Sequence, residues 1–225
     1  MLALGSDTAG SVRVPASMTG CVGLKTSFGR WSLEGIFPLS PTLDTAGILT
    51  RSAEDALFGF SAIDPAYHGR LDELLHQVEG LEPSSISISS GDPNLWEGCE
   101  AGIAETVEDA IGELSRSGVK VIEAPVAESK QAIEFFNLGS VPGIELKEFL
   151  QSELPEWLET ADPVVGSRIK ISSSVDAAEY LCRLRILKKL GVAVQDHFAK
   201  VDLIACPTIP DLPASSIPSQ RGRRV

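Results

Sequence analysis

Apolar and polar positions repeat with different periods along the chain, and the changes of period mark its segments. Within residues 97–117 the apolar side chains recur every three or four positions, which is typical of an amphipathic helix; they are Ile103, Val107, Ala110, Ile111 and Leu114. Short apolar runs around Ile88 and at residues 119–122 indicate a strand on each side of this helix. Gly118 suits the end of the helix, because a left-handed residue costs least at glycine. Residues 84–126 therefore predict a strand, a helix and a parallel strand joined by a right-handed crossover.

The segment that follows has a mainly helical pattern over residues 129–200. It begins with helical patches that two prolines interrupt. A longer helix is predicted over residues 174–200, because a wide apolar face recurs there; it is formed by Ala178, Leu181, Leu184, Ile186, Leu187 and Leu190. Residues 201–206 predict a buried strand that a proline stops. Residues 201–225 are therefore expected to hold this strand and a proline-rich tail without periodicity.

Residues 1–55 differ from the rest of the chain in how closely their glycines are spaced. Glycines recur there at short intervals among several prolines. Long helices cannot form through that spacing, so short strands and tight turns are predicted. At residues 52–55 the sequence Ser-Ala-Glu-Asp resembles a capping box and predicts the start of a helix. Together these segments predict an α/β fold, a mixed sheet flanked by helices, within a single domain over residues 1–225.

Composition and charge exclude several classes of protein. The chain has 225 residues, of which 43% are hydrophobic and 22% charged, the ordinary composition of a globular domain. Its formal net charge of −12 argues against direct binding of nucleic acid, which needs a basic face. No stretch reaches the roughly 18 apolar residues that cross a membrane. The composition thus predicts a soluble protein with neither a nucleic-acid nor a membrane partner.

The cysteines and histidines are spread along the chain. Cys21, Cys99, Cys182 and Cys206 form no C-x-x-C pair, which indicates reduced side chains in a cytoplasmic protein rather than a disulfide framework or a zinc site. The three histidines lack acidic or cysteine neighbours at the spacing of metal ligands. We therefore expect a cytoplasmic protein without a metal site and without a cofactor.

The richest chemistry lies in residues 5–16, with the sequence GSDTAGSVRVPA. Small residues at positions 8–10 let the backbone turn sharply before Ser11, and successive N–H groups of such a turn can converge on an anion. A serine hydroxyl beside that nest can attack a carbonyl carbon while the nest holds the developing oxyanion. Asp7 and Arg13 flank the serine and either lock the loop by pairing or reach a substrate. The alternative is that the stretch is a turn with no chemical role.

This stretch resembles the later half of the signature of the amidase signature family, an Asp-x-Gly/Ala-x-Ser-aliphatic-Arg-x-Pro run. The similarity continues in the family's order through residues 20–30, 35–38, 42–47 and 51–55. One departure is Thr26, where many members have a proline after Gly-Leu-Lys; we expect it to change a local turn and not the chemistry. Asp44, by the same resemblance, is expected to brace a loop.

The resemblance implies a serine hydrolase of small carbon–nitrogen amides that uses no cofactor. Ser11 falls at the position of the nucleophile. The backbone amides of Thr8, Ala9, Gly10 and Ser11 fall at the position of the oxyanion hole. In the family a lysine acts as base and relays a proton through a second serine in a cis peptide, and the nucleophile passes through an acyl-enzyme.

The lysine and the bridging serine of the family lie well before the nucleophile, whereas ten residues precede Ser11 here. Lys25 matches a different lysine of the family's pattern. The chain therefore resembles an internal, truncated piece of an amidase, inactive alone or dependent on a missing N-terminal segment in trans, and prone to self-association through an open sheet edge. Two alternatives stay open: a glutaminase like the ammonia-releasing subunit of glutamyl-tRNA(Gln) amidotransferase, and a non-catalytic remnant or binding module.

Overall fold

The computed structural model describes residues 1–138 and 141–211, and there helices surround two three-stranded sheets. One sheet is antiparallel, in the order β1 (Leu2–Asp7), β3 (Thr45–Thr50), β2 (Val22–Lys25). The other is parallel, in the order β5 (Lys120–Glu123), β4 (Ser87–Ser90), β6 (Leu203–Ile204). The α/β class is confirmed. The strands predicted to share one mixed sheet are divided between these two.

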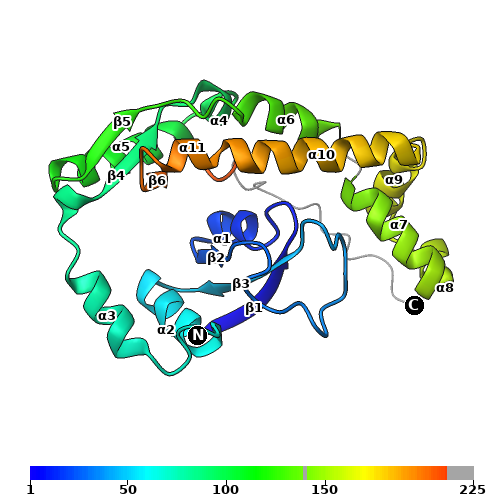
Figure 1. Ribbon diagram of the computed structural model, residues 1–225, viewed down its shortest axis with the longest axis horizontal. Coiled ribbons are helices and arrows are strands. Elements are labelled where there is room, and N and C mark those ends of the chain that lie inside the picture. The colour runs from blue at the N-terminus through cyan, green and yellow to red at the C-terminus, as the bar shows by residue number, and fades with distance from the viewer. Residues whose placement is uncertain (139–140, 212–225) are drawn as a thin grey trace.

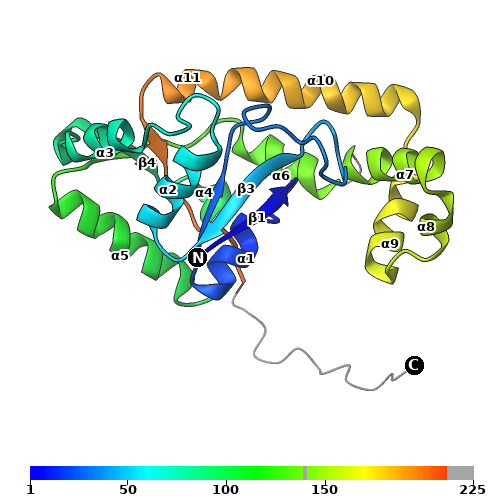
Figure 2. The ribbon, with the colours of Figure 1, turned by 90° about the horizontal axis from the view of Figure 1, so that it is seen from below.

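The helices take up the larger part of the described chain. They are α1 (Arg13–Thr19), α2 (Ala53–Ile63), α3 (Leu71–Glu79), the 3₁₀ helix η1 (Pro83–Ser85), α4 (Pro93–Trp96), α5 (Ile103–Arg116), α6 (Ser129–Asn137), α7 (Val141–Glu153), α8 (Pro155–Glu159), α9 (Pro163–Ser172), α10 (Ala177–Ala193) and α11 (Gln195–Phe198). Figures 1 and 2 both show α10 running along the molecule, from the parallel sheet at one end to α7–α9 at the other. None of the helices in these residues is long and apolar enough to cross a membrane.

Helix α1 packs closely on one face of the antiparallel sheet, and glycine makes this approach possible. A Cβ atom built at Gly23 would lie 2.8 Å from the Cβ of Ala16 and 2.9 Å from the main-chain oxygen of Val12. At Gly47 it would lie 2.6 Å from the main-chain oxygen of Leu24. The glycines of residues 1–55 thus allow close packing as well as tight turns. The start of α1 therefore lies against the end of β1.

The opposite face of this sheet carries the core of the N-terminal region. Trp31, Ala46, Ile48 and Ala56 are buried together there, and α2 covers them. The start of α2 is as predicted, because the hydroxyl of Ser52 accepts a hydrogen bond from the main-chain N–H of Asp55 at 3.1 Å. Burial of these four apolar side chains stabilises the sheet that carries the loop around residue 11.

The predicted strand–helix–strand unit is confirmed as β4, α5 and β5. The two strands pair in parallel, with Ile88 opposite Val121. Gly118 follows α5 with a left-handed φ of 107°, which ends the helix as predicted. The helix begins at Ile103 rather than near residue 97, because Gly102 forms its N-terminal cap.

The C-terminal strand differs from its prediction. The pattern of residues 201–206 predicts a buried strand, but β6 spans Leu203–Ile204 and Leu203 is half exposed, so burial at Val201 alone matches the expectation. The strand lies at the edge of the parallel sheet, beside β4, and has no second strand partner in the described residues. The long helix predicted over residues 174–200 is present as α10 and α11. The proline-rich tail from residue 212 onward lies outside the described residues.

Candidate active site

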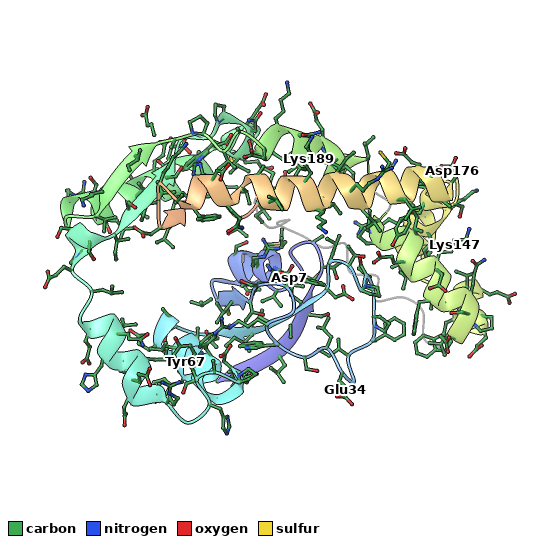
Figure 3. The ribbon with its side chains drawn as sticks, in the orientation of Figure 1. Asp7, Glu34, Tyr67, Lys147, Asp176 and Lys189 are labelled. Carbon is green, nitrogen blue, oxygen red and sulfur yellow. The ribbon has the colours of Figure 1, made fainter. Side chains whose placement is uncertain are left out.

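The loop that contains Ser11 is folded around the carboxylate of Asp7, the last residue of β1. Asp7 is 1% exposed and lies at the centre of the molecule in the view of Figure 3. Its oxygens accept hydrogen bonds from the N–H groups of Gly10 at 2.7 Å and Val12 at 3.2 Å. The guanidinium of Arg13 donates to both carboxylate oxygens at 3.0 Å. The main-chain oxygen of Asp7 in turn accepts from the hydroxyl of Thr45 at 2.8 Å. Residues 10–13 therefore wrap the buried carboxylate of Asp7.

The electrostatics of this anchor favour its charged form. Burial alone would raise the pKa of Asp7, but the hydrogen bond from Arg13 and those from the Gly10 and Val12 amides outweigh burial and lower its pKa to about 2. Of the two roles that the sequence left open for Asp7 and Arg13, the structure shows the pairing that locks the loop. A two-point contact between guanidinium and carboxylate also fixes the orientation of both groups.

Ser11 lies in the turn between β1 and α1, and it is exposed to solvent. None of the hydrogen bonds within residues 1–138 and 141–211 involves its hydroxyl, and the same holds for the main-chain N–H groups of Thr8, Ala9 and Ser11. The N–H of Gly10 is used differently, because it donates to Asp7. Within the described residues the turn thus contains a hydroxyl and three neighbouring amide groups without a hydrogen-bond partner, and Gly10 is a structural member of the loop.

A second buried carboxylate, Asp44, fixes the start of the loop. It accepts a hydrogen bond of 2.5 Å from the hydroxyl of Thr8. Its other oxygen accepts from the main-chain N–H groups of Leu39 and Ser40, each at 2.9 Å. Asp44 therefore braces a loop, the role that the resemblance implies for it.

Glu145 on α7 extends this network, and no sequence pattern points to it. Its carboxylate accepts from the hydroxyls of Ser40 and Thr42 at 2.5 Å and from the hydroxyl of Tyr180 at 2.6 Å. Burial would raise the pKa of Glu145, but these hydrogen bonds outweigh burial and lower its pKa. Burial and the bond to Glu145 raise the pKa of Tyr180 to about 12. Ser40 and Thr42 lie more than 100 positions from Glu145, which hides these contacts from any local pattern.

Lys25 does not contact the Ser11 hydroxyl. Its half-buried ammonium donates to the main-chain oxygen of Thr26 at 2.8 Å. Burial, and then the charge of Arg13, lower the pKa of Lys25. At the departure from the family pattern, the hydroxyl of Thr26 donates to the main-chain oxygen of Ala46 at 3.3 Å, so this residue ties two strands together. In the described part of the chain, a base in contact with Ser11 is therefore missing.

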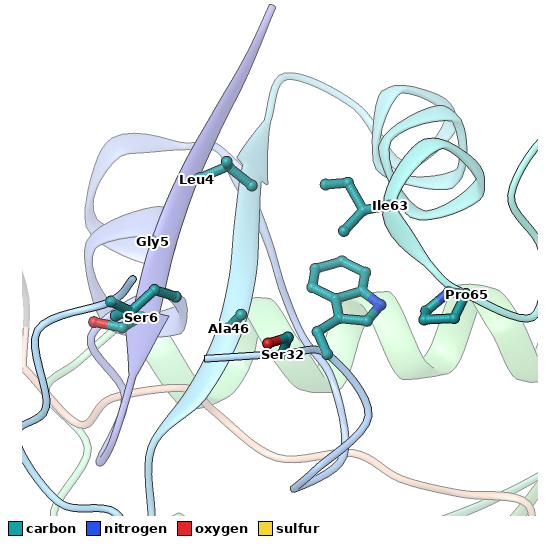
Figure 4. A pocket seen from close by; sticks show the side chains of 9 residues that line it. Leu4, Gly5, Ser6, Ser32, Ala46, Ile63 and Pro65 are labelled. Carbon is teal, nitrogen blue, oxygen red and sulfur yellow. The ribbon is translucent and has the colours of Figure 1, made fainter. Parts of the chain in front are cut away.

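An apolar pocket of about 490 Å³ opens on the face of the antiparallel sheet away from α1 (Figure 4). Leu4 and Ser6 of β1 form one wall, and Ile63 and Pro65 form the other. Trp31 also lines the pocket. Ser11 does not line it. The described residues also contain no cluster of histidine, cysteine or acidic side chains that could hold a metal ion.

The chain is similar over most of its length to known proteins. The amidase family model matches residues 1–220. A 2-amino-5-chloromuconic acid deaminase of Comamonas testosteroni is 40% identical over 95% of this chain and 45% of its own length. A mandelamide hydrolase of Pseudomonas putida is 27% identical over 96% of this chain and 46% of its own length. One subunit of the glutamyl-tRNA(Gln) amidotransferase of Persephonella marina is 29% identical over 93% of this chain and 49% of its own length.

Solved structures show the same fold. The crystal structure of an amidase superposes with a TM-score of 0.75 and 26% sequence identity, covering 96% of this chain and 47% of the amidase. The chain thus spans about half the length of the curated relatives it matches. Since the family model covers nearly every residue, the chain is a member of the amidase family, the amidase-signature hydrolases.

Proposed function

We propose that Ser11 is the nucleophile of an amide-hydrolysing site and that the N–H groups of Thr8, Ala9 and Ser11 bind the oxyanion. The observation that carries this proposal is the exposed Ser11, whose hydroxyl and neighbouring amide donors have no hydrogen-bond partner in the described residues. Preorganised donors of this kind stabilise developing charge strongly, because they need no reorganisation during the reaction. The two-point contact of Arg13 with the buried Asp7 carboxylate supplies the rigidity.

The proposed reaction proceeds in two steps. The Ser11 oxygen forms a bond to the carbonyl carbon of the amide while a base takes its proton, and the negative charge on the carbonyl oxygen is held by the loop amides. The tetrahedral adduct collapses, the carbon–nitrogen bond breaks, and the nitrogen leaves with the proton as ammonia or an amine. Water then attacks the acyl-enzyme, which releases a carboxylic acid and restores the hydroxyl.

The base for these steps is proposed to come from a polypeptide segment other than the residues described. Ser11 is exposed to solvent, and the relatives of the chain are about twice as long as the region that they share with it. We propose that an N-terminal amidase segment acting in trans supplies the lysine and the bridging serine of the family. The cytoplasm is the proposed location, supported by four free cysteines in residues 1–211.

A glutaminase is the second candidate. The similarity to a subunit of a glutamyl-tRNA(Gln) amidotransferase favours it. In this case the substrate is glutamine and the ammonia passes to another polypeptide of the complex. Glutaminase activity that appears when the other amidotransferase polypeptides are added would support this candidate, and its absence under the same conditions would remove it.

Ammonia release tests the proposal. The chain is mixed with the part of the Comamonas testosteroni deaminase that precedes the matched region, and ammonia is measured over a panel of small amides. We expect turnover that needs both polypeptides and is lost in Ser11→Ala but kept in Ser27→Ala, a change at another exposed serine. Turnover that survives Ser11→Ala would contradict the proposed nucleophile, and a mixture that folds but releases no ammonia would favour a non-catalytic module.

A further inference from the structure

A path of hydrogen bonds between buried and half-buried groups leads from helix α7 to the Ser11 loop. We propose that Glu145 is a positioning residue of the Ser11 site: it acts through Ser40, Asp44 and Thr8 on the amides that would hold the oxyanion. This inference rests on the proposed function of Ser11. It concerns a residue outside the signature-like region, on a helix that sequence patterns connect to no chemistry.

The first link joins two carboxylates through one serine. Ser40 is fully buried. Its hydroxyl donates to Glu145 at 2.5 Å, and its main-chain N–H donates to Asp44 at 2.9 Å. A displacement of Ser40 therefore affects both acceptors at once. The turn is tightened further because the N–H of Asp44 donates back to the main-chain oxygen of Ser40 at 2.7 Å.

The second link reaches the nucleophile loop. Asp44 is 4% exposed, and its oxygen that does not face the turn accepts the hydroxyl of Thr8 at 2.5 Å. Thr8 begins the run of residues whose N–H groups are proposed to bind the oxyanion. The opposite end of the loop is held by Asp7 through Gly10 and Val12. Thr8 thus depends on Asp44 for its orientation, whereas the later loop residues depend on Asp7.

The chemistry of Glu145 explains why a carboxylate is needed. It accepts from the Ser40 hydroxyl, from the Thr42 hydroxyl and N–H, and from Tyr180 on α10. A carboxylate is a pure acceptor with lone pairs for all of these donors. In Glu145→Gln one oxygen becomes an NH₂ group that faces donors, so the turn at residues 40–42 loses part of its support while the size of the side chain is kept.

The experiment measures the rate at which a fluorophosphonate modifies Ser11, in the same two-polypeptide mixture used for turnover. We expect Glu145→Gln to slow labelling about tenfold, because small misplacements near a reacting group have effects of this order or larger. Glu153→Gln, at an exposed acid on the same helix, should label as the wild type does. Ser40→Ala, which cuts the path but keeps the carboxylate, should slow labelling in the same direction.

A comparison in the Thr8→Val variant distinguishes a positioning role of Glu145 from an effect on the stability of the whole protein. In Thr8→Val the path no longer reaches the loop, so adding Glu145→Gln should cause no further slowing. Equal slowing in both backgrounds, or normal labelling of Glu145→Gln, would overturn the inference.

Amide hydrogen exchange gives a readout that does not need a reactive serine. Exchange at residues 8–11 should be faster in Glu145→Gln than in Glu153→Gln, and equal exchange would overturn the inference. If the wild type is never labelled, the proposed nucleophile fails, while the exchange comparison still decides whether Glu145 orders the loop.

Discussion

Replacing Asp7 by asparagine removes the charge around which residues 10–13 are folded. The side chain is 1% exposed and accepts the two-point contact of Arg13 and the N–H of Gly10. In Asp7→Asn an NH₂ group faces these donors, so at least one contact is lost and the guanidinium loses its counter-charge. A hydrogen bond to a charged group contributes about 1.5–3 kcal/mol. Because the Arg13 side chain is 46% exposed and water can solvate it, we expect the free energy of unfolding to fall by about 2–3 kcal/mol.

Urea unfolding followed by circular dichroism measures this loss. The matched control is Asp55→Asn, at an acid that is 40% exposed and pairs with the N-terminal ammonium at 3.5 Å, where we expect a loss of less than about 1 kcal/mol. A carboxylate whose pKa is lowered in the folded state stabilises that state at every pH above its pKa in the unfolded chain, about 4. This contribution is lost as the pH falls towards about 2, the pKa of folded Asp7. Equal losses in the two variants, or a wild-type advantage that does not shrink from pH 4 towards pH 2, would show that the Asp7 charge does not stabilise the loop.

Two further changes test the packing and the edge of the antiparallel sheet. Gly23→Ala places a Cβ 2.8 Å from that of Ala16, so thermal unfolding should show a free energy of unfolding lower by about 1–3 kcal/mol. In the control Gly166→Ala on α9, the added Cβ meets nothing within 4 Å and should not destabilise the protein. Equal effects of the two changes would contradict the close packing of α1. In the described residues β1 has a strand partner on one side, and Leu4 is 71% exposed, so Leu4→Lys should reduce self-association in sedimentation velocity. Association that does not respond to this change would locate the contact elsewhere.

Sequence reasoning finds the elements whose signals are local. The stripe of α5 and the cap at Ser52 are decided within a few residues, and both are present in the structure. The division into two sheets cannot be predicted from local patterns, because it depends on which distant strands pair. The pairing of β6 with β4 is one example. Helix α1 escapes prediction as well, since a seven-residue helix after a glycine turn is too short to show a period.

The contacts of the candidate site also divide into local ones, which the sequence predicts, and long-range ones, which it does not. The pairing of Asp7 with Arg13 spans six positions and is among the predicted roles. The contact of Thr8 with Asp44 needs the pairing of β1 with β3. Glu145 reaches Ser40 across 105 positions, and an acid on an ordinary helix carries no mark of such a partner. Resemblance supplies the proposed role of the serine, and the structure supplies the contacts that hold its loop.

Mapping a fluorophosphonate adduct by mass spectrometry identifies the nucleophile of the site. The chain is treated with the probe in the presence of the N-terminal amidase segment, digested, and searched for the modified peptide. We expect one adduct on Ser11, absent from Ser11→Ala and retained in Ser27→Ala. An unmodified Ser11 in a folded mixture, or an adduct that persists in Ser11→Ala, would contradict the proposed nucleophile.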